Sequence, residues 1–319
     1  MANKLFYLFN SGKNSKFSYY LQNYLRMLIP NSYFRKKREK VLADAKKRFD
    51  WNYMQERIDY YNKLDRNHHL PEDCTTLKDL KLSKRKVYFF DSYEFTRWFD
   101  PNFKWCFLPG DITHLTEHPT ILKSRPLCEN NQNSVLMKLD KVRHFIFVDD
   151  KKSFSEKRNM VIFRGKVLKK EARLTFMRRY WGNPMFDLGD IGKKAYPEWR
   201  TEKKTINEHL DYKFIMAIEG NDVASNLKWV MSSNSVAVMP RPTCETWFME
   251  GKLIPNYHYI EVKPDFSDVE ERVNYYIQHP EEAEVIIRNA HEYMEQFKDE
   301  EREQLISLHV LDKYFKFVK

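Results

Sequence analysis

Residues that can carry chemistry gather around two of the eight glycines in the chain. Gly165 ends the apolar run VIFRG, and Gly220 ends the run IMAIEG just before Asn221 and Asp222. Each glycine directly follows a predicted strand, and open α/β sheets bind ligands at the carboxyl ends of their strands. We predict a helix directly after Gly220, whose free backbone N–H groups would bind a phosphate or diphosphate. The alternative is that Asn221 or Asp222 only caps this helix.

The elements that must position these residues alternate between strand and helix from about residue 160. The predicted strands are NMVIFRG, MFDLGD, KFIMAIEG, SVAVMP and HYIEVK, and the predicted helices between them are 169–181, 205–211 and 223–233. Such alternation indicates parallel strands with crossover helices, as in a doubly wound α/β domain. No GxGxxG fingerprint or GxxxxGK[ST] loop is present, so neither a standard dinucleotide site nor a P-loop is indicated.

The flanking segments are predicted from their apolar periodicity. Residues 17–29 and 35–64 are predicted helices, and residues after 266 are predicted to be helical to the end of the chain. The short runs KVYFF, WCFL, TILK and FIFV are predicted strands. We place the domain boundary in the charged segment DDKKSFSEKRN, near residues 150–160.

The charge is uneven along the chain. The formal net charge is +10, but residues 1–50 and 151–200 each carry +9, whereas residues 251–300 carry −7. Two basic zones indicate an anionic partner: a nucleic acid, an anionic membrane surface or the phosphates of a small substrate. A solvated basic face is the alternative.

Composition excludes several classes of protein. Apolar residues make up 42% and aromatic residues 15% of the 319 residues, a globular balance that a disordered chain lacks. No segment has the roughly 20 uncharged apolar residues of a membrane span, and we expect no secretory signal. The four cysteines form no CxxC pair, so we expect reduced thiols in a cytosolic protein.

Several blocks resemble glycosyltransferase family 90. They are EGNDVASNLKWVMSSNSVAVMP with ETWFMEGKLIPNYHYIEVKPDFSDVEE, and, earlier in the chain and in the family's order, PGDIT, PTILKSRP and VIFRG. The resemblance spans roughly residues 85–290. The bacterial lipopolysaccharide core transferases of the LpsA type fit best, because they share GNDVA-NLKW and KSRP.

This resemblance implies a GT-B-like α/β fold, in which two Rossmann-like domains face a cleft. Residues 1–155 would form a helical arm plus the acceptor-side α/β domain, and 156–290 the domain that binds the donor nucleotide. Residues 291–319 would be C-terminal helices that pack back on the first domain. The implied activity is inverting transfer of a hexose or pentose from a UDP-sugar, with no metal or other cofactor.

Asp111 matches the family's catalytic aspartate, and the resemblance implies that it is the base that deprotonates the acceptor hydroxyl. Its alternative is a turn or capping aspartate after Pro-Gly. Lys123 and Arg125 of KSRP are implied contacts in the cleft, and the alternative for both is a solvated charge at a strand end.

The implied donor site combines Arg164, the segment from Gly220 to Lys228, and Glu245. Arg164 follows a buried strand and is a candidate for the diphosphate, with a surface ion pair as its alternative. Many family members have an arginine where Asn226 stands, so Lys228, Arg164 or another basic residue must meet the diphosphate charge. The predicted donor-binding residues are Arg164, Gly220, Asn221, Asp222, Val223, Ala224, Ser225, Lys228 and Glu245.

The implied partners are a UDP-sugar and an acceptor hydroxyl on a lipopolysaccharide core or another cell-surface glycan or glycolipid. The protein would be cytoplasmic, with peripheral contact to the anionic inner face of the bacterial inner membrane. The competing hypothesis is a nucleic-acid-binding protein that uses the basic N-terminal arm, although no recognition motif of that class is present. The pair Asp149–Asp150 lacks D-x-D spacing, His68–His69 has no second ligand pair, and His114 and His118 belong to a Pro-bounded loop instead of a helix, so we predict no metal site.

Overall fold

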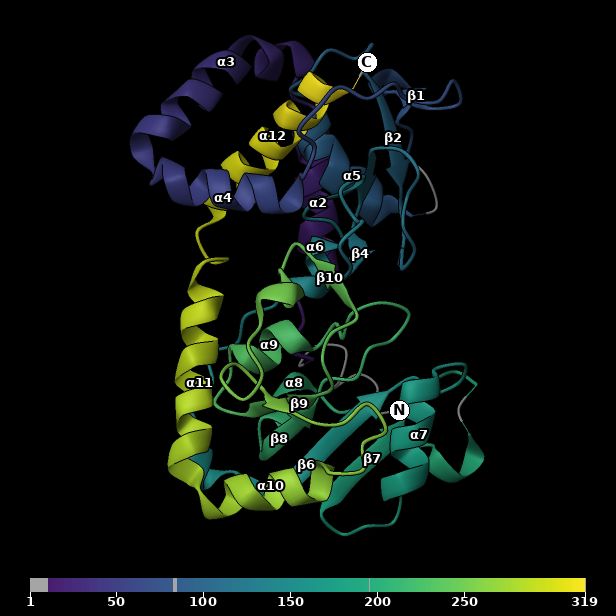
Figure 1. Cartoon of the computed structure of the whole chain (residues 1–319), viewed down its shortest axis with the longest axis vertical. Helices are drawn as coiled ribbons and strands as arrows, with labels where there is room; N and C mark the ends of the chain where they lie inside the picture. The colour runs from purple at the N-terminus through teal and green to yellow at the C-terminus, as the bar shows by residue number, and fades with distance from the viewer. Residues whose placement is uncertain (1–10, 83–84, 195, 319) are drawn as a thin grey trace. The chain divides into compact units, whose positions relative to one another are not determined.

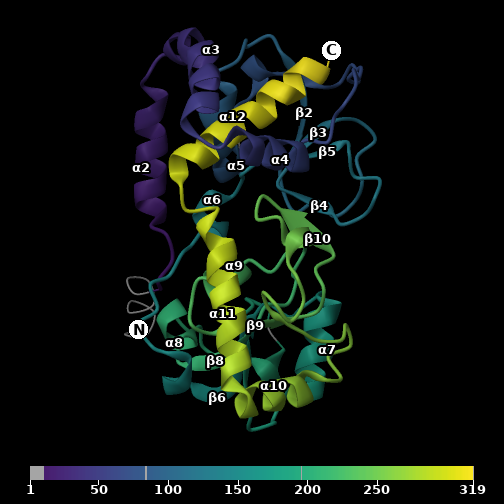
Figure 2. The same ribbon diagram turned by 60° about the vertical axis from the view of Figure 1, so that its left-hand side comes forward.

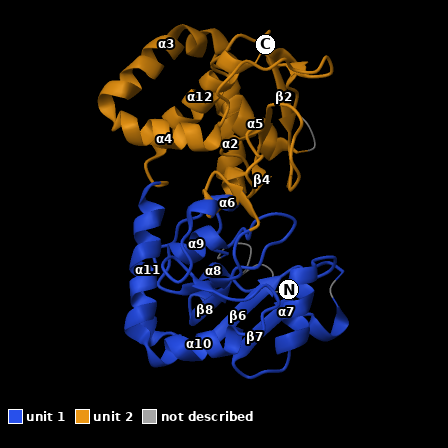
Figure 3. Ribbon diagram, viewed as in Figure 1, with its two compact units in different colours: residues 1–14, 143–242, 251–296 blue, residues 15–142, 243–250, 297–319 orange. Residues whose placement is uncertain are grey.

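The computed structural model describes residues 11–82, 85–194 and 196–318, and these form two compact units (Figures 1 and 3). Unit 1 comprises residues 11–14, 143–242 and 251–296, and unit 2 comprises residues 15–142, 243–250 and 297–318. One of the points at which the chain passes between the units lies within the short helix α6 (Lys141–His144). The domain boundaries expected at residues 155 and 290 stay predictions.

Unit 1 is built on a five-stranded sheet in which all strands are parallel. Its order is β7 (Phe186–Asp190), β6 (Arg158–Gly165), β8 (Tyr212–Met216), β9 (Val236–Met239) and β11 (Ile260–Glu261). The inner strands β8 and β9 are buried along their whole length, which explains why their sequences are continuous apolar runs rather than alternating ones. The mixed α/β class with parallel strands agrees with the sequence analysis.

Helices connect these strands as the alternation predicts. They are α7 (Glu171–Tyr180) after β6, α8 (Ile206–His209) after β7 and α9 (Leu227–Met231) after β8, followed by α10 (Val269–Gln278) and α11 (Pro280–Glu295). Phe176 and Met177 of α7 are fully buried and share a core with Phe163 of β6 and Phe214 of β8. Burying such a face on the sheet stabilises α7, a helix too short to be stable alone.

Unit 2 combines a four-stranded sheet with a group of helices. The sheet order is β1 (Thr75–Thr76), β2 (Lys104–Leu108), β3 (Thr120–Leu122) and β5 (Ser134–Leu136), with β1 antiparallel and the others parallel. A separate antiparallel pair joins β4 (Ser124–Pro126) to β10 (Cys244–Thr246). The helices are α2 (Lys16–Met27), α3 (Asn31–Arg48), α4 (Trp51–Tyr61), α5 (Lys86–Thr96) and α12 (Glu300–Phe317). In the two units together, short 3₁₀ turns lie at Leu77–Asp79, Phe154–Glu156, Pro197–Trp199 and Glu250–Lys252.

Three element predictions were wrong. The run KVYFF is the start of helix α5 and not a strand, because an apolar run of this length fits a buried helix as well as a strand. The run FIFV forms no strand. The helix predicted over residues 35–64 is two helices, because the chain leaves helical geometry at Phe49 and Asp50 then caps α4 through the Tyr53 N–H.

The expectation of four reduced thiols was also wrong, because Cys74 and Cys106 form a disulfide with a Cα–Cα distance of 5.1 Å. The strand register explains the pairing. Thr75 of β1 lies opposite Trp105 of the antiparallel strand β2, so Cys74, one residue before Thr75, lies opposite Cys106, one residue after Trp105. Cys128 and Cys244 keep their thiols. The cysteines therefore no longer support a reducing compartment.

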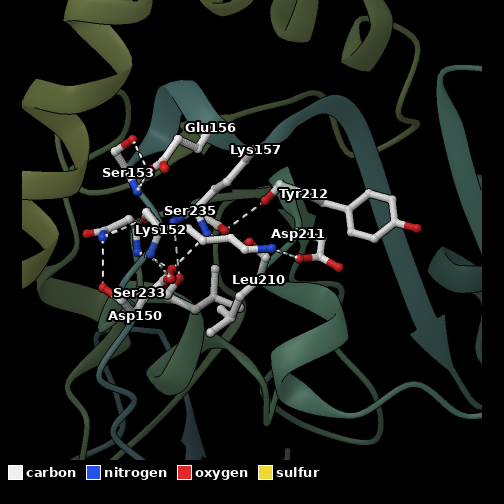
Figure 4. Close-up of polar contacts among 12 residues, drawn as sticks. Asp150, Lys152, Ser153, Glu156, Lys157, Leu210, Asp211, Tyr212, Ser233 and Ser235 are labelled. Carbon is white, nitrogen blue, oxygen red and sulfur yellow. Dashed lines mark hydrogen bonds and ion pairs between the residues drawn. The ribbon is translucent and has the colours of Figure 1, made fainter.

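The charged segment expected as a boundary packs against the start of the unit 1 sheet (Figure 4). The Lys157 ammonium group donates to the Asp150 carboxylate at 2.7 Å and to the Leu210 carbonyl. The Asn234 amide donates to the Asp150 carbonyl at 3.0 Å. Because Lys157, Leu210 and Asn234 lie just before β6, β8 and β9, this ion pair holds together the amino ends of three strands.

A buried ionic cluster joins α4 to α12, the last helix of unit 2, where α12 packs against α3, α4 and α5 (Figure 2). Glu303 of α12 accepts hydrogen bonds from Arg57 of α4, from Lys138 at 3.1 Å and from the Trp247 indole at 2.6 Å. Burial acts to raise the pKa of Glu303, but Lys138 and Arg57 outweigh it and hold the pKa below its ordinary value. This cluster therefore stabilises the fold at neutral pH, and its contribution is lost as the pH falls through the pKa of the folded state.

We expect Glu303→Ala to lower the free energy of unfolding by about 3–5 kcal/mol, because it leaves Arg57 and Lys138 buried without their carboxylate. Chemical denaturation followed by circular dichroism measures this change. The matched control is Glu301→Ala on the same helix, which removes the exposed ion pair with Arg48 and should change stability far less. Equal losses in the two variants would contradict the role of the buried cluster.

Candidate functional site

The topology of the unit 1 sheet points to one crevice. Numbered along the chain, its strands have the order 2-1-3-4-5, so the direction of winding reverses between β6 and β8. Open α/β sheets bind ligands beyond the carboxyl ends of the strands at such a switch point. Gly165 ends β6 here, and Gly220 follows β8 by four residues, so both glycines singled out from the sequence lie at this edge.

The Arg173 side chain spans this switch point. It comes from the first turn of α7 and donates from Nη1 to the Lys166 carbonyl at 3.1 Å, just after β6. It also donates from Nε to the Glu219 carbonyl at 3.0 Å and from Nη2 to the Ile218 carbonyl at 2.8 Å, both after β8. A Cβ at Gly220 would lie 3.1 Å from the guanidinium, so glycine lets the backbone approach this group closely.

The charge of Arg173 is poorly compensated. In the described part of the chain it forms hydrogen bonds to carbonyl oxygens and no ion pair. Burial, followed by the nearby charge of Arg143, lowers the pKa of Arg173 to about 10, and Asp190 opposes this shift. The Asp190 carboxylate itself accepts three backbone N–H groups, from Val167, Gly192 and Tyr196.

Two lysines add to this positive edge. Lys166 follows Gly165 and is exposed, and Lys170 donates to the Asn221 side-chain oxygen in the loop after β8. We call Arg143, Lys166, Lys170 and Arg173 the basic cluster. Cations held together in this way favour the binding of an anion such as a phosphate or diphosphate.

The helix predicted after Gly220 begins later in the chain than expected. Residues 220–226 form a loop in which the Gly220 N–H donates to the Asp222 carbonyl at 3.0 Å, and α9 begins only at Leu227. The loop exposes Asn221 and partly exposes Gly220 and Ser225, whereas Asp222, Val223 and Ala224 are buried. A diphosphate site at this edge would therefore consist of loop backbone and basic side chains instead of a helix start.

The other predicted donor residues of unit 1 face the protein interior. The Arg164 guanidinium pairs with Asp187 of the neighbouring strand β7, and burial leaves its side chain only 6% exposed. Lys228 is fully buried in α9, and the Asn226 amide donates to the Met216 carbonyl at 3.0 Å. Arg164 and Asn226 therefore make contacts within the protein. A donor-binding role for Arg164 and Lys228 stays a prediction.

In unit 2, the residues of the KSRP block hold the loop that carries Asp111. The Lys123 ammonium group donates to the Asp111 carboxylate, and the Ser124 hydroxyl contacts both the N–H and the carbonyl of Ile112. Lys123 is 1% exposed and Asp111 is 19% exposed, so the carboxylate is oriented by a buried cation and still reaches solvent. Gly110 adopts a φ of +133°, a conformation that favours glycine, beside this aspartate.

Arg125 and Glu245 form a fully buried ion pair between β4 and β10. Arg125 also donates to the carbonyls of Tyr60, Tyr61 and Ser134, and Glu245 accepts from the Tyr60 hydroxyl. With exposures of 0% and 1%, these side chains hold the ETWF block in unit 2. Contact of either with a ligand stays a prediction that this geometry does not favour.

Within the described residues, no group of three or more His, Cys, Asp or Glu side chains is arranged to hold a metal ion. Asp150 is the partner of Lys157, and Asp149 is exposed with Lys151 as its partner. His114 and His118 are exposed on the loop after Asp111. None of the helices in the described ranges is long and apolar enough to cross a membrane.

Arg173 is the site residue that the sequence analysis missed. It lies in the predicted helix 169–181 among many basic residues, and nothing local distinguishes it from Arg178 or Arg179. Its position eight residues after Gly165, at the start of the helix that follows a glycine-ended strand, is the signal that could have identified it.

Comparison with known proteins gives a family match and a similar protein. Residues 133–319, more than half of the chain, match the model of glycosyl transferase family 90. The matched range includes the whole unit 1 sheet but begins after Asp111. The O-glucosyltransferase LpsA of Dichelobacter nodosus is 37% identical over 267 residues, which cover 83% of this chain and 84% of that protein. The family and branch identified from the sequence blocks are thereby confirmed.

We expect Arg173→Ala to weaken the binding of UDP by roughly tenfold or more, because it removes a charge-assisted bond to the diphosphate of about 1.5–3 kcal/mol. Arg173→Lys should lie between wild type and Arg173→Ala, since it keeps the charge but loses the planar fork. Isothermal titration calorimetry with UDP measures both. Arg178→Ala, an exposed change on the same helix, is the control, and unchanged affinity in both folded Arg173 variants would contradict the site.

Proposed function

Since the chain belongs to glycosyltransferase family 90, we propose that it transfers a hexose or pentose from a UDP-sugar to an acceptor hydroxyl with inversion. That it is a glycosyltransferase follows from the family. The donor, the mechanism and the acceptor are proposals. Because its relative is named an O-glucosyltransferase, UDP-glucose is the first donor to test.

The observation that supports this function best is the basic cluster at the switch point of the unit 1 sheet. A UDP-sugar carries its negative charge on the diphosphate, and this charge grows on the leaving UDP as the glycosidic bond breaks. A partly buried guanidinium fixed to Lys166, Ile218 and Glu219 is already oriented, so it stabilises that charge without reorganisation. We propose that Arg173 takes the part of the arginine that many family members have at the position of Asn226.

Asp111 is the proposed general base. Its carboxylate takes the proton of the acceptor hydroxyl as the hydroxyl oxygen attacks the anomeric carbon, and the bond from that carbon to the UDP oxygen breaks. The buried Lys123 donates to the Asp111 carboxylate and holds it in place. The GT-B-like pair of Rossmann-like domains belongs to this proposal, and the parallel sheet of unit 1 supports one of them.

The proposed acceptor is a lipopolysaccharide core or another cell-surface glycan or glycolipid, and the proposed location is the cytoplasmic face of the inner membrane. The similarity to LpsA supports a glycan acceptor. The competing nucleic-acid hypothesis explains the basic N-terminal residues but does not explain the family match.

We expect Asp111→Asn to lower the transfer rate by about 10²–10⁴-fold, because the amide is nearly isosteric but cannot take the proton. UDP affinity should change little, since the proposed donor contacts lie on residues of unit 1. The measurement pairs UDP release from UDP-glucose, in the presence of truncated lipopolysaccharide, with UDP titration on the same variant.

Lys123→Met serves as a second variant for Asp111. It removes the cation that holds the Asp111 carboxylate in place, so the transfer rate should fall while UDP affinity changes little. A base role is contradicted if Asp111→Asn binds UDP normally and transfers sugar at a near wild-type rate.

Activity is expected to survive EDTA, because side chains and loop backbone would carry the leaving-group charge in the proposed mechanism. The test compares UDP release before and after chelation, and again after addition of manganese. Loss of turnover that manganese restores would show that the reaction depends on a metal ion.

A further inference from the structure

The helix α2 is packed on unit 2 with its polar side inward. The Tyr19 hydroxyl donates to the buried Asp91 carboxylate at 2.7 Å, and Arg26 pairs with Glu94 at 3.0 Å. Asn23, which is 6% exposed, donates to the Tyr19 carbonyl at 2.8 Å. A surface helix of a globular protein normally buries its apolar side. In α2 the contacts with the rest of unit 2 are mainly polar, together with ring contacts of Tyr20 and Tyr24 to the buried Phe90.

The opposite side of α2 and the turn after it carry large apolar side chains that are turned away from unit 2. Phe17 and Leu28 are each 78% exposed, Leu25 is 54% and Leu21 is 47% exposed. With 3.6 residues per turn, Phe17, Leu21 and Leu28 fall on one line along the helix, with Leu25 beside it. We call these four residues the apolar stripe. An apolar stripe of this size, on a helix anchored by polar contacts, marks an interaction surface.

The surroundings of the apolar stripe are strongly basic. Residues 11–50 contain eleven Lys and Arg against three Asp and Glu. Exposed cations lie just before α2 and in the first turns of α3, the helix that follows it: Lys13, Lys16, Arg35, Lys36, Lys37 and Lys40. Apolar side chains flanked by exposed cations match the chemistry of an anionic bilayer surface, which offers acyl chains beneath negatively charged headgroups.

We propose that the apolar stripe inserts into the interfacial layer of an anionic membrane while the cations of α3 contact the lipid headgroups. This inference deepens the proposed function and rests on it for the biological setting, because a glycolipid acceptor would lie in that membrane. The anchoring contacts of Tyr19 and Arg26 keep α2 attached to unit 2, so docking needs no rearrangement of the fold.

Two other occupants fit these observations less well. A nucleic acid would satisfy the cations but would leave the apolar stripe in water, since its backbone is a row of charged phosphates. A second copy of the chain would cover the stripe but would bring two basic α3 segments of the same sign together.

The test is flotation of the full chain with vesicles of phosphatidylethanolamine and phosphatidylglycerol, and separately with vesicles of phosphatidylcholine, in the absence of donor and acceptor. We expect binding to the anionic vesicles and at least about tenfold weaker partitioning to the neutral ones. The double variant Leu21→Glu with Leu25→Glu should lose about tenfold or more of the anionic binding. Lys36→Glu with Lys37→Glu should weaken it and flatten its salt dependence.

The control is Val285→Glu, which replaces a 43% exposed apolar residue of α11 and should bind vesicles like wild type. Circular dichroism melting confirms that each variant is folded. The proposal is overturned if wild type does not bind anionic vesicles, or if the Leu21/Leu25 variant binds them equally well. It is also overturned if light scattering shows that the wild type is a dimer and the Leu21/Leu25 variant a monomer. Binding of oligonucleotides through the same leucines would overturn it as well. The vesicle experiment measures no sugar transfer, so a negative result there does not contradict the proposed reaction. A negative result in the Asp111 experiment likewise does not contradict membrane binding by the apolar stripe.

Discussion

Compensation of buried charge is the constraint on which much of this structure depends. A charge removed from water is costly unless a partner of opposite charge accompanies it. The chain meets this cost by pairing buried cations with carboxylates: Arg125 with Glu245, Arg57 with Glu303, and Lys157 with Asp150. The first two pairs join segments that are far apart in the sequence, β4 with β10 and α4 with α12.

Arg173 departs from this rule, and the departure is informative. Its guanidinium is partly buried and fixed by three carbonyl oxygens, which orient the group but do not neutralise it. Burial, and to a smaller extent the charge of the nearby Arg143, lower the pKa of Arg173 to about 10. Among the described residues, buried Arg97 is likewise held by carbonyl oxygens without an ion pair, but Arg173 lies at the switch point of a parallel sheet, where we propose that it meets an anionic ligand.

The helix α2 departs from a different rule, because its apolar side faces outward and its polar side holds it to unit 2. Both departures concern surfaces rather than the core, and both become favourable only when a second molecule is present. The diphosphate would compensate the basic cluster, and an anionic bilayer would cover the apolar stripe. The soluble donor and the membrane-held acceptor that we propose would need two such surfaces on one protein.

Local pattern by itself determined the parallel α/β class, the strands that end at Gly165 and near Gly220, and the family, because buried parallel strands and their glycine-ended turns leave a signature in consecutive residues. It could not separate a strand from a buried helix at KVYFF, since both bury a short apolar run on every side. The start of α9, the partner of Cys74 and the contacts of Glu245 also had to come from the tertiary structure. Arg173 shows the reason most clearly. Its sequence neighbours resemble it in type, and only the packing of α7 across β6 and β8 decides that this arginine, and not Arg178, is fixed at the switch point.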